Sequence, residues 1–351
     1  MLTRERIVAL AEKRGRITTT ELAASFSVSR QYVNLLIHGM VERGELIKIG
    51  GTRYAFYVLP DYARIHPELA STRFVKSFVN EKLEEHVVLA RIGEMFPPIL
   101  KLPENIRSIF TFAFSEMLKN AIEHSGSVRI GVEVSVLKRT LSFVIEDSGV
   151  GVFRNVMRRR GLASELEAIQ DILKGKTTTM PKSHSGEGIF FTSKSGDVFV
   201  LDSYGYQLIV DNTIPDVFIK TVKKQKRGTR VSFQVALDSD CHLQEVFNRY
   251  ANISDKSDYG FDKTEIRVKL YAIGGVHISR SQARRVLTGL EKFKIVLFDF
   301  ENVPTVGQAF ADEVFRVFHH KHPEIRLEAE HMEAGVKFMI ERARNEADAS
   351  F

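Results

Sequence analysis

The residues best suited to chemistry lie in the middle of the chain, and the first set of them shares one helix. Glu116, Asn120 and His124 are spaced four apart, so they lie on one face of a helix. Glu116 is a carboxylate that can orient or deprotonate an attacking nucleophile, as a general base does. His124 ends the helix and is more readily a polar cap than a reacting group. A lone Glu-x-x-x-Asn is more often a solvated helix face, so the role of Glu116 as a base depends on the segments that follow.

Two pairs of glycines follow this helix, and glycines allow the backbone of a loop to lie close around a phosphate. Asp147 stands at the end of a predicted strand, ahead of Gly149 and Gly151, which allow backbone conformations and close approach that side chains forbid. Gly186 and Gly188 precede a predicted helix start, where backbone N–H groups hold phosphate oxygens. Each segment alone is weak evidence, because Asp-x-Gly-x-Gly is common in turns. Together they predict a nucleotide site.

In this order and spacing the three segments resemble the nucleotide-binding boxes of the GHKL, or Bergerat-fold, ATPases. That superfamily includes histidine kinases, anti-sigma-factor serine kinases, gyrase and MutL-type proteins. The resemblance implies that ATP binds with Mg²⁺, and that Asn120 supplies its amide oxygen to the metal. It also implies that Asp147 accepts a hydrogen bond from the adenine amino group and that Thr229 supports the adenine pocket. Residues 152–185, between the glycine pairs, form an insert of lid length.

Other nucleotide and metal sites find no support in the sequence. A Walker-type Gly-x-x-x-x-Gly-Lys is lacking, which excludes a P-loop, and no cluster of cysteines and histidines indicates zinc. His86 lies beside Glu84 and Glu85, but its flanks do not match the dimerising helix of histidine kinases. A sensor histidine kinase is therefore a poor fit.

Residues 1–60 predict a helix, then a helix-turn-helix with hydroxyl caps, then a hairpin around a Gly-Gly turn. This order resembles a winged helix-turn-helix domain. Arg30 and Gln31 open the expected recognition helix, where polar side chains can meet base edges. Lys48 and Arg53 lie on the expected wing and can meet phosphates. DNA is the expected partner, although winged helices also dock proteins.

The next two regions are expected to be a helical connector, residues 61–100, and the ATP-binding domain, residues 101–240. In the connector the apolar stripe of Val75, Val79 and Val87 predicts one long helix over residues 73–95. In the ATP-binding domain a helix is predicted over residues 105–124. Strands are predicted over residues 128–137, 141–147, 197–202, 206–211 and 229–235. Helices packed on one antiparallel sheet make an α+β layer.

Four short motifs stand out in residues 258–346, at residues 278–283, 290–293, 296–300 and 307–313. With these motifs the region resembles STAS-like domains, the family related to anti-sigma-factor antagonists. Strands are predicted over residues 265–273 and 294–300, and helices over residues 281–293, 308–320 and 331–343. In the antagonists a serine at the start of the helix after the Asp299-like strand is phosphorylated by a GHKL kinase. The corresponding stretch here, residues 306–310, reads Val-Gly-Gln-Ala-Phe and has no hydroxyl; Thr305 is the nearest. This departure favours signalling by contact over phosphorylation.

The whole chain bounds these expectations. Its 351 residues suit two or three domains, and its net charge of +6 permits nucleic-acid binding without demanding it. The single cysteine, Cys241, cannot form an internal disulfide, and no signal peptide or membrane span is evident, so a cytoplasmic location is expected. The expected fold class is α+β multidomain: a winged helix, an α/β-sandwich Bergerat ATPase and a small STAS-like α/β domain.

The expected function is that of a cytoplasmic regulator whose ATP state controls its binding to partners. DNA is expected on the winged helix and a protein partner on the STAS-like domain, with no membrane partner; a homodimer is open. One alternative is a serine/threonine protein kinase of the anti-sigma-factor type. Another is an adaptor that holds ATP without turning it over.

Overall fold

A computed structural model describes residues 2–49, 55–66, 72–176, 186–223, 225–250, 261–271 and 279–348. The chain divides into two compact units, Met1–Gly149 with Arg230–Asp240, and Val150–Thr229 with Cys241–Phe351. Each unit is described by itself below. Among the described helices, none is long and apolar enough to cross a membrane.

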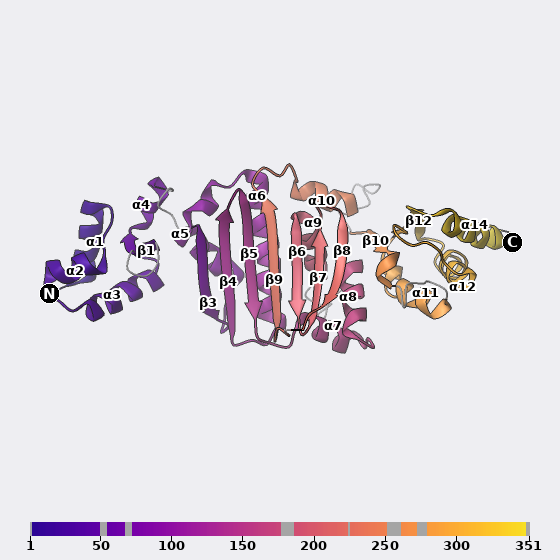
Figure 1. Ribbon diagram of the computed structural model, residues 1–351, viewed down its shortest axis with the longest axis horizontal. Coiled ribbons are helices and arrows are strands. Elements are labelled where there is room, and N and C mark those ends of the chain that lie inside the picture. Colours follow the sequence, from indigo (N-terminus) through magenta and orange to yellow (C-terminus); the bar gives the residue numbers. More distant parts are fainter. Residues whose placement is uncertain are drawn as a thin grey trace. The chain divides into compact units, whose positions relative to one another are not determined.

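The N-terminal part of the first unit combines helices with a small antiparallel sheet (Figure 1). Its described elements are α1 (Arg4–Arg14), α2 (Thr19–Phe26), α3 (Arg30–Glu42), β1 (Ile47–Ile49) and β2 (Phe56–Val58). The Thr18 side chain and Glu21 cap α2 reciprocally, and Ser29 caps α3 by accepting from the Tyr32 N–H. Ile7 and Val33 are fully buried between these elements, so the hydroxyl caps and the apolar spacing act together.

The predicted long helix over residues 73–95 is wrong. After α4 (Pro60–Ile65), Arg73–Val79 is a strand, β3, and only Glu85–Met95 is helical, as α5. β3 pairs antiparallel with β4, with Phe74 opposite Val134. Val75 and Val79 are spaced four apart, and four is a multiple of the strand period of two, so they share one strand face as readily as one helix face. The pairing with β4, which is remote in sequence, decides between the two.

The rest of the first unit agrees closely with the expected elements. A 3₁₀ turn (Pro97–Lys101) leads into α6 (Glu104–His124), which is followed by β4 (Arg129–Leu137) and β5 (Thr140–Asp147). α6 packs on β5 through a buried aromatic group, in which the Phe143 ring centroid lies 5.5 Å from that of Phe114 and 5.0 Å from that of Phe233. This core holds the α6 face and the end of β5 in fixed relation.

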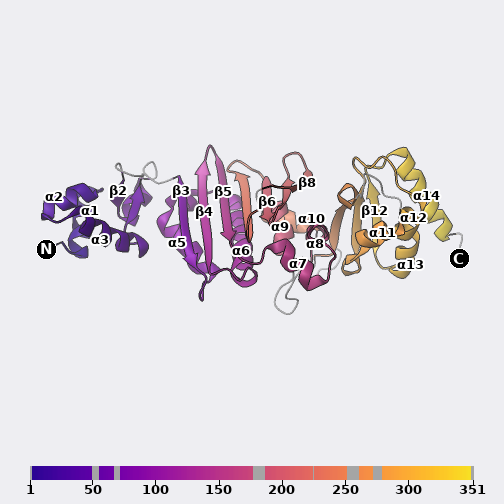
Figure 2. The same ribbon diagram turned by 60° about the horizontal axis from the view of Figure 1, so that its bottom comes forward.

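The described strands of the middle region form a seven-stranded sheet in the order β3-β4-β5-β9-β6-β7-β8. Its remaining strands are β6 (Val198–Ser203), β7 (Tyr206–Asp211), β8 (Asp216–Thr221) and β9 (Thr229–Ala236). The sequence predicted β6, β7 and β9 but not β8. In the second unit, α7 (Val152–Arg160) and α8 (Glu165–Lys174) lie side by side, and α9 (Gly188–Ser195) packs against β6 (Figure 2).

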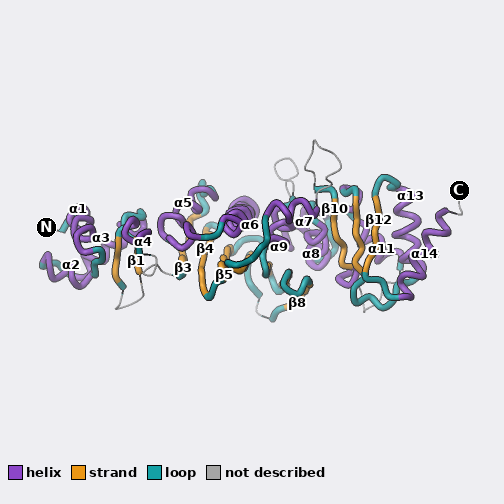
Figure 3. Tube along the Cα trace, turned by 90° about the horizontal axis from the view of Figure 1, so that it is seen from above, coloured by secondary structure: helices purple, strands orange, loops and turns teal. Residues whose placement is uncertain are grey.

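The C-terminal part of the second unit contains a parallel sheet in the order β10-β11-β12, drawn in orange in Figure 3. Its described elements are α10 (Leu243–Tyr250), β10 (Lys263–Arg267), a 3₁₀ turn (Val268–Tyr271), α11 (Arg280–Leu287), a second 3₁₀ turn (Leu290–Lys292), β11 (Ile295–Asp299), α12 (Gln308–Asp312), a π-helix (Glu313–Phe318), α13 (His319–Lys321), β12 (Arg326–Glu330) and α14 (Ala334–Asp348). The expected strand over residues 265–273 ends early, at Arg267, and β12 was not expected. The chain is thus a mixed α+β protein with an antiparallel sheet and a small parallel one.

Candidate functional site

The α6 face that carries Glu116, Asn120 and His124 lies at the margin of the core. All three side chains are half-buried, whereas Phe114 and Met117 on the same helix are fully buried. A charged side chain on a solvated face would instead be largely exposed. The structure therefore keeps the three side chains on one semi-enclosed face, as their spacing predicted.

Asp147 is the last residue of β5 and is only 4% exposed. Its Oδ1 accepts a hydrogen bond of 2.8 Å from the Gly149 N–H. The neighbouring Ser148 N–H donates to the Ser127 Oγ at 3.1 Å, which ties the turn to the segment before β4. Because a buried carboxylate is costly unless hydrogen bonds offset its desolvation, this turn is built to hold Asp147 in place.

Gly149 fixes the turn against the end of α6. A Cβ atom at position 149 would lie 1.8 Å from the Ser125 carbonyl oxygen, far inside van der Waals contact. Ser125 directly follows α6, so only glycine lets the Asp147 turn pack on the end of the helix that carries Glu116 and Asn120. In the first unit, the predicted purine anchor and the predicted metal ligand thus belong to one packed substructure.

In the second unit, Gly151 and Thr229 meet at the start of α7. Gly151 has a φ of +80°, and a Cβ atom there would lie 2.5 Å from the Tyr204 ring. The Thr229 Oγ1 accepts a 3.0 Å hydrogen bond from the Val152 N–H, the first residue of α7. One partner of the threonine hydroxyl is therefore a helix N-terminus, where an oxygen satisfies an otherwise unpaired donor.

The second glycine pair opens α9. Gly186 has a φ of +77°, Gly188 is the first residue of the helix, and the intervening Glu187 makes no side-chain cap. Residues 177–185, which are the C-terminal end of the predicted insert, lie outside the described residues. Phe190 and Phe191 are buried, so α9 is anchored just after its glycines.

Two of the predicted DNA-contacting residues line one surface hollow. Gln31 on α3 and Lys48 on β1 border a hollow of about 430 Å³, which Asn34, Leu35 and His38 also line. Arg30 is exposed at the start of α3 but does not line the hollow, and Arg53 lies outside the described residues. Asn34, Leu35 and His38 were not predicted as contact residues, although their spacing of three, four and seven residues from Gln31 places them on its helix face.

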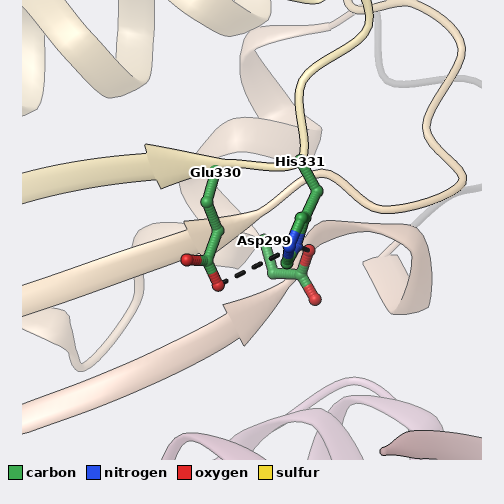
Figure 4. A group of neighbouring side chains, drawn as sticks. All are labelled: Asp299, Glu330 and His331. Atoms are coloured by element: carbon green, nitrogen blue, oxygen red, sulfur yellow. Dashed lines mark hydrogen bonds and ion pairs between the residues drawn. The ribbon is translucent and has the colours of Figure 1, made fainter.

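A further polar group lies where two parallel strands end. Asp299 ends β11 and Glu330 ends β12, and the adjacent His331 places its Nδ1 2.9 Å from the Asp299 Oδ1 and 3.9 Å from the Glu330 Oε1 (Figure 4). Among the described residues, this is the group whose ligand atoms lie close enough together to hold a metal ion. The hydrogen bond to Asp299 raises the pKa of His331.

The stretch that corresponds to the phosphorylated segment of the antagonists has no hydroxyl on its helix, as its sequence indicated. α12 begins at Gln308 after Gly307 and continues with Ala309 and Phe310. Thr305 is exposed in the preceding loop. A hydroxyl is therefore available before the helix and not at its start.

Comparison with known proteins identifies one part of the chain. No curated protein and no solved structure matches the chain. A family model described as STAS-like domain of unknown function (DUF4325) matches residues 282–337, from α11 into α14. The C-terminal part of the chain therefore contains a STAS-like domain.

Proposed function

We propose that this chain is a nucleotide-dependent regulator that binds ATP with Mg²⁺ and transmits the state of that site to its flanking regions. The observation that carries the proposal is the buried Asp147 at the end of β5, held by the Gly149 N–H. A fixed, desolvated carboxylate is a strong acceptor for the amino group of a purine. Gly149 packs the same turn on the end of α6, which carries Glu116 and Asn120.

The other residues have roles that agree with their surroundings. Asn120 would bind the metal through its amide oxygen, and Glu116 would act as general base from the same half-buried face. The N–H groups after Gly186 and Gly188 would hold phosphate oxygens at the start of α9. Bound Mg²⁺ would supply positive charge against the phosphate oxygens.

Binding of the nucleotide is tested by calorimetry on the full chain. We expect ATP with Mg²⁺ to bind, GTP to bind more weakly, and Asp147→Asn to weaken ATP binding roughly 10- to 100-fold, because a hydrogen bond to a charged group contributes about 1.5–3 kcal/mol. Asp240→Asn is the matched control, since Asp240 is exposed. Equal ATP affinity in wild type and Asp147→Asn would refute the purine anchor.

The fate of the phosphate separates the proposed regulator from its rivals. Glu116→Ala should retain ATP binding and lose turnover by roughly 10²–10⁴-fold, because it removes the base and leaves the pocket. A protein kinase of the anti-sigma-factor type, which the STAS-like domain favours as second candidate, would transfer labelled phosphate to protein. An adaptor would bind ATP without turnover or transfer.

DNA is the partner we propose for the N-terminal region. The supporting observation is the hollow bordered by α3 and β1, where exposed polar side chains surround Leu35, which is 72% exposed. Amide side chains suit adenine edges, and an apolar side chain suits a thymine methyl group in the major groove. Lys48, exposed on β1, suits a neighbouring phosphate.

A further inference from the structure

We propose that the C-terminal region containing the STAS-like domain docks in cis on α8 and α9, and that this docking and nucleotide binding stabilise each other. The inference rests on the proposed ATP site, because α9 begins at the second glycine pair. All the contacts that carry it lie within the second unit. The occupant of the α8 surface is thus the chain's own C-terminal region, and the coupling is regulatory.

The first contact is a pair of hydrogen bonds around Gln170 of α8. Its Nε2 donates to the Leu270 carbonyl oxygen at 2.7 Å, and its own backbone carbonyl accepts from the Tyr271 hydroxyl at 3.1 Å. Gln170 and Tyr271 are both buried. Buried polar groups of this kind must be paired, and here α8 and the 3₁₀ turn pair with each other directly.

The second contact buries a lysine. Lys174, the last residue of α8, is 4% exposed, and its Nζ donates to the carbonyl oxygens of Arg285 at 3.0 Å and Thr288 at 2.8 Å. These carbonyls end α11, where the helix dipole favours a cation. The Lys174 carbonyl in turn accepts from the Thr264 hydroxyl of β10 at 2.6 Å. One residue therefore bonds to two elements of the C-terminal region.

An ion pair extends this contact to α7. The Arg160 Nε lies 2.7 Å from an Asp171 carboxylate oxygen, and Asp171 is buried on α8. Gly289, just after α11, lies beside both: a Cβ atom there would be 3.8 Å from each side chain. The end of α11 thus covers an ion pair that links the two helices of the insert.

The third contact is aromatic and includes α9. Phe261, shortly before β10, has its ring centroid 4.7 Å from that of Phe190, 4.9 Å from that of Phe191 and 5.3 Å from that of Phe293. Gly175, directly after α8, has a φ of +80°, and a Cβ atom there would lie 2.5 Å from the Phe261 ring. The end of α8 and the first turn of α9 are thus both fixed to the same surface.

These contacts set the direction of the coupling. The glycines that would hold phosphate precede Phe190 by two and four residues, so docking of the C-terminal region restricts the start of α9. A restricted site loses less conformational entropy when a nucleotide binds, so undocking should weaken ATP binding. By thermodynamic reciprocity, ATP should stabilise the docked state by the same factor.

The test uses the full chain with Lys174→Met, which keeps an unbranched apolar side chain and removes the donors. Lys321→Met, an exposed lysine on α13, is the matched control. We expect Lys174→Met to weaken ATP binding about 5-fold or more, within the usual range of allosteric coupling. Tyr271→Phe, which deletes only a hydroxyl, should act in the same direction and serves if Lys174→Met does not fold.

Hydrogen exchange of the amides at the end of α11 is the second measurement. We expect Lys174→Met to speed their exchange and ATP to slow it in wild type. Faster exchange together with unchanged ATP affinity would overturn the coupling and leave a purely structural contact. Absence of ATP binding by wild type would overturn the proposed function, and with it the coupling, while the exchange difference between wild type and Lys174→Met would still report docking.

Discussion

The absence of a side chain at Gly149 determines where the Asp147 carboxylate lies. The carboxylate is buried at a strand end, and the turn that follows packs on the Ser125 carbonyl with no room for a Cβ atom. A residue with a side chain would push the turn away from α6 and Asp147 with it. Packing therefore requires glycine at position 149, and this fixes the position of the Asp147 turn against α6.

Gly149→Ala should accordingly be destabilising, by about 2–4 kcal/mol, because the 1.8 Å approach to the Ser125 carbonyl oxygen requires the backbone to move. Gly93→Ala is the matched control: it lies within α5, where a Cβ atom would meet nothing within 4 Å. That change should stabilise by about 1 kcal/mol through helix propensity. Chemical denaturation of both variants measures the difference, and similar stability of the two would contradict the packing argument.

Lys174 makes a second prediction at this scale, on pH. Burial lowers its pKa to about 8, from an unfolded value near 10.5. The unfolded chain therefore binds more protons between these values, and the contribution of Lys174 to stability rises with pH across that window, by at most about 1.4 kcal/mol per pH unit. It is lost as pH falls to about 8.

The comparison of wild type with Lys174→Met isolates this effect. Thermal unfolding should be measured from about pH 7.5 to about pH 10, which covers most of the window opened by the lowered pKa of Lys174. Wild type should gain stability relative to the variant as the pH rises. A difference that does not change with pH would show that Lys174 titrates normally and is not buried as described.

At the scale of single elements, α3 shows how helical periodicity assembles a surface. Gln31, Asn34, Leu35 and His38 recur at helical spacing and border one hollow together with Lys48 of β1. The opposite face of α3 is buried through Val33, Ile37 and Met40. The helix is thus fixed by one face and free to bind with the other.

If this surface binds DNA, Asn34→Ala should lower affinity by about 1–3 kcal/mol at its preferred site and relax specificity there. Lys48→Ala should weaken binding to all sequences similarly and reduce the salt slope by roughly 1. Lys13→Ala, exposed on α1, is the control and should change little. Titration of genomic fragments over a range of salt concentrations measures these effects, and failure of every fragment to bind at low salt would favour a protein partner.

On the scale of the whole molecule, the STAS-like domain differs in chemistry from a phosphorylated antagonist. Ala309 and its neighbours Gln308 and Phe310 offer no hydroxyl at the start of α12. The contacts of the C-terminal region with α8 and α9 provide a route for communication that needs no covalent change. The domain is therefore suited to signalling through contact.

Incubation of the full chain with Mg-ATP should leave the C-terminal domain unmodified. Intact-mass and peptide mass spectrometry measure this directly, with Thr305→Ala as the control for the one exposed hydroxyl before α12. Stoichiometric phosphate on Thr305 in wild type, absent in Thr305→Ala, would instead support the protein-kinase reading.

Local chemistry in the sequence was sufficient for the elements whose signals are short-range. Hydroxyl side chains predicted the caps at Thr18 and Ser29, and periodicity predicted the helix over residues 105–124. Periodicity and turn residues predicted the strand pair that ends at Asp147. The structure agrees with these predictions within a residue or so. The shared face of Glu116 and Asn120 follows from the same periodicity. The match of residues 282–337 to a STAS-like model agrees with motifs visible in the sequence.

Contacts between distant segments decided the rest. Residues 73–79 could form a helix or a strand by local pattern, and pairing with β4 made them a strand. Lys174 looks like a surface lysine in an insert, and only the arrival of the α11 carbonyls, more than a hundred residues later, makes it a buried donor. Position 149 must be glycine because a Cβ atom there would collide with the Ser125 carbonyl oxygen. β12 forms because β11 offers an edge with which it can pair. Periodicity and propensity act over a few residues, whereas burial and hydrogen-bond pairing depend on which segments the fold brings together.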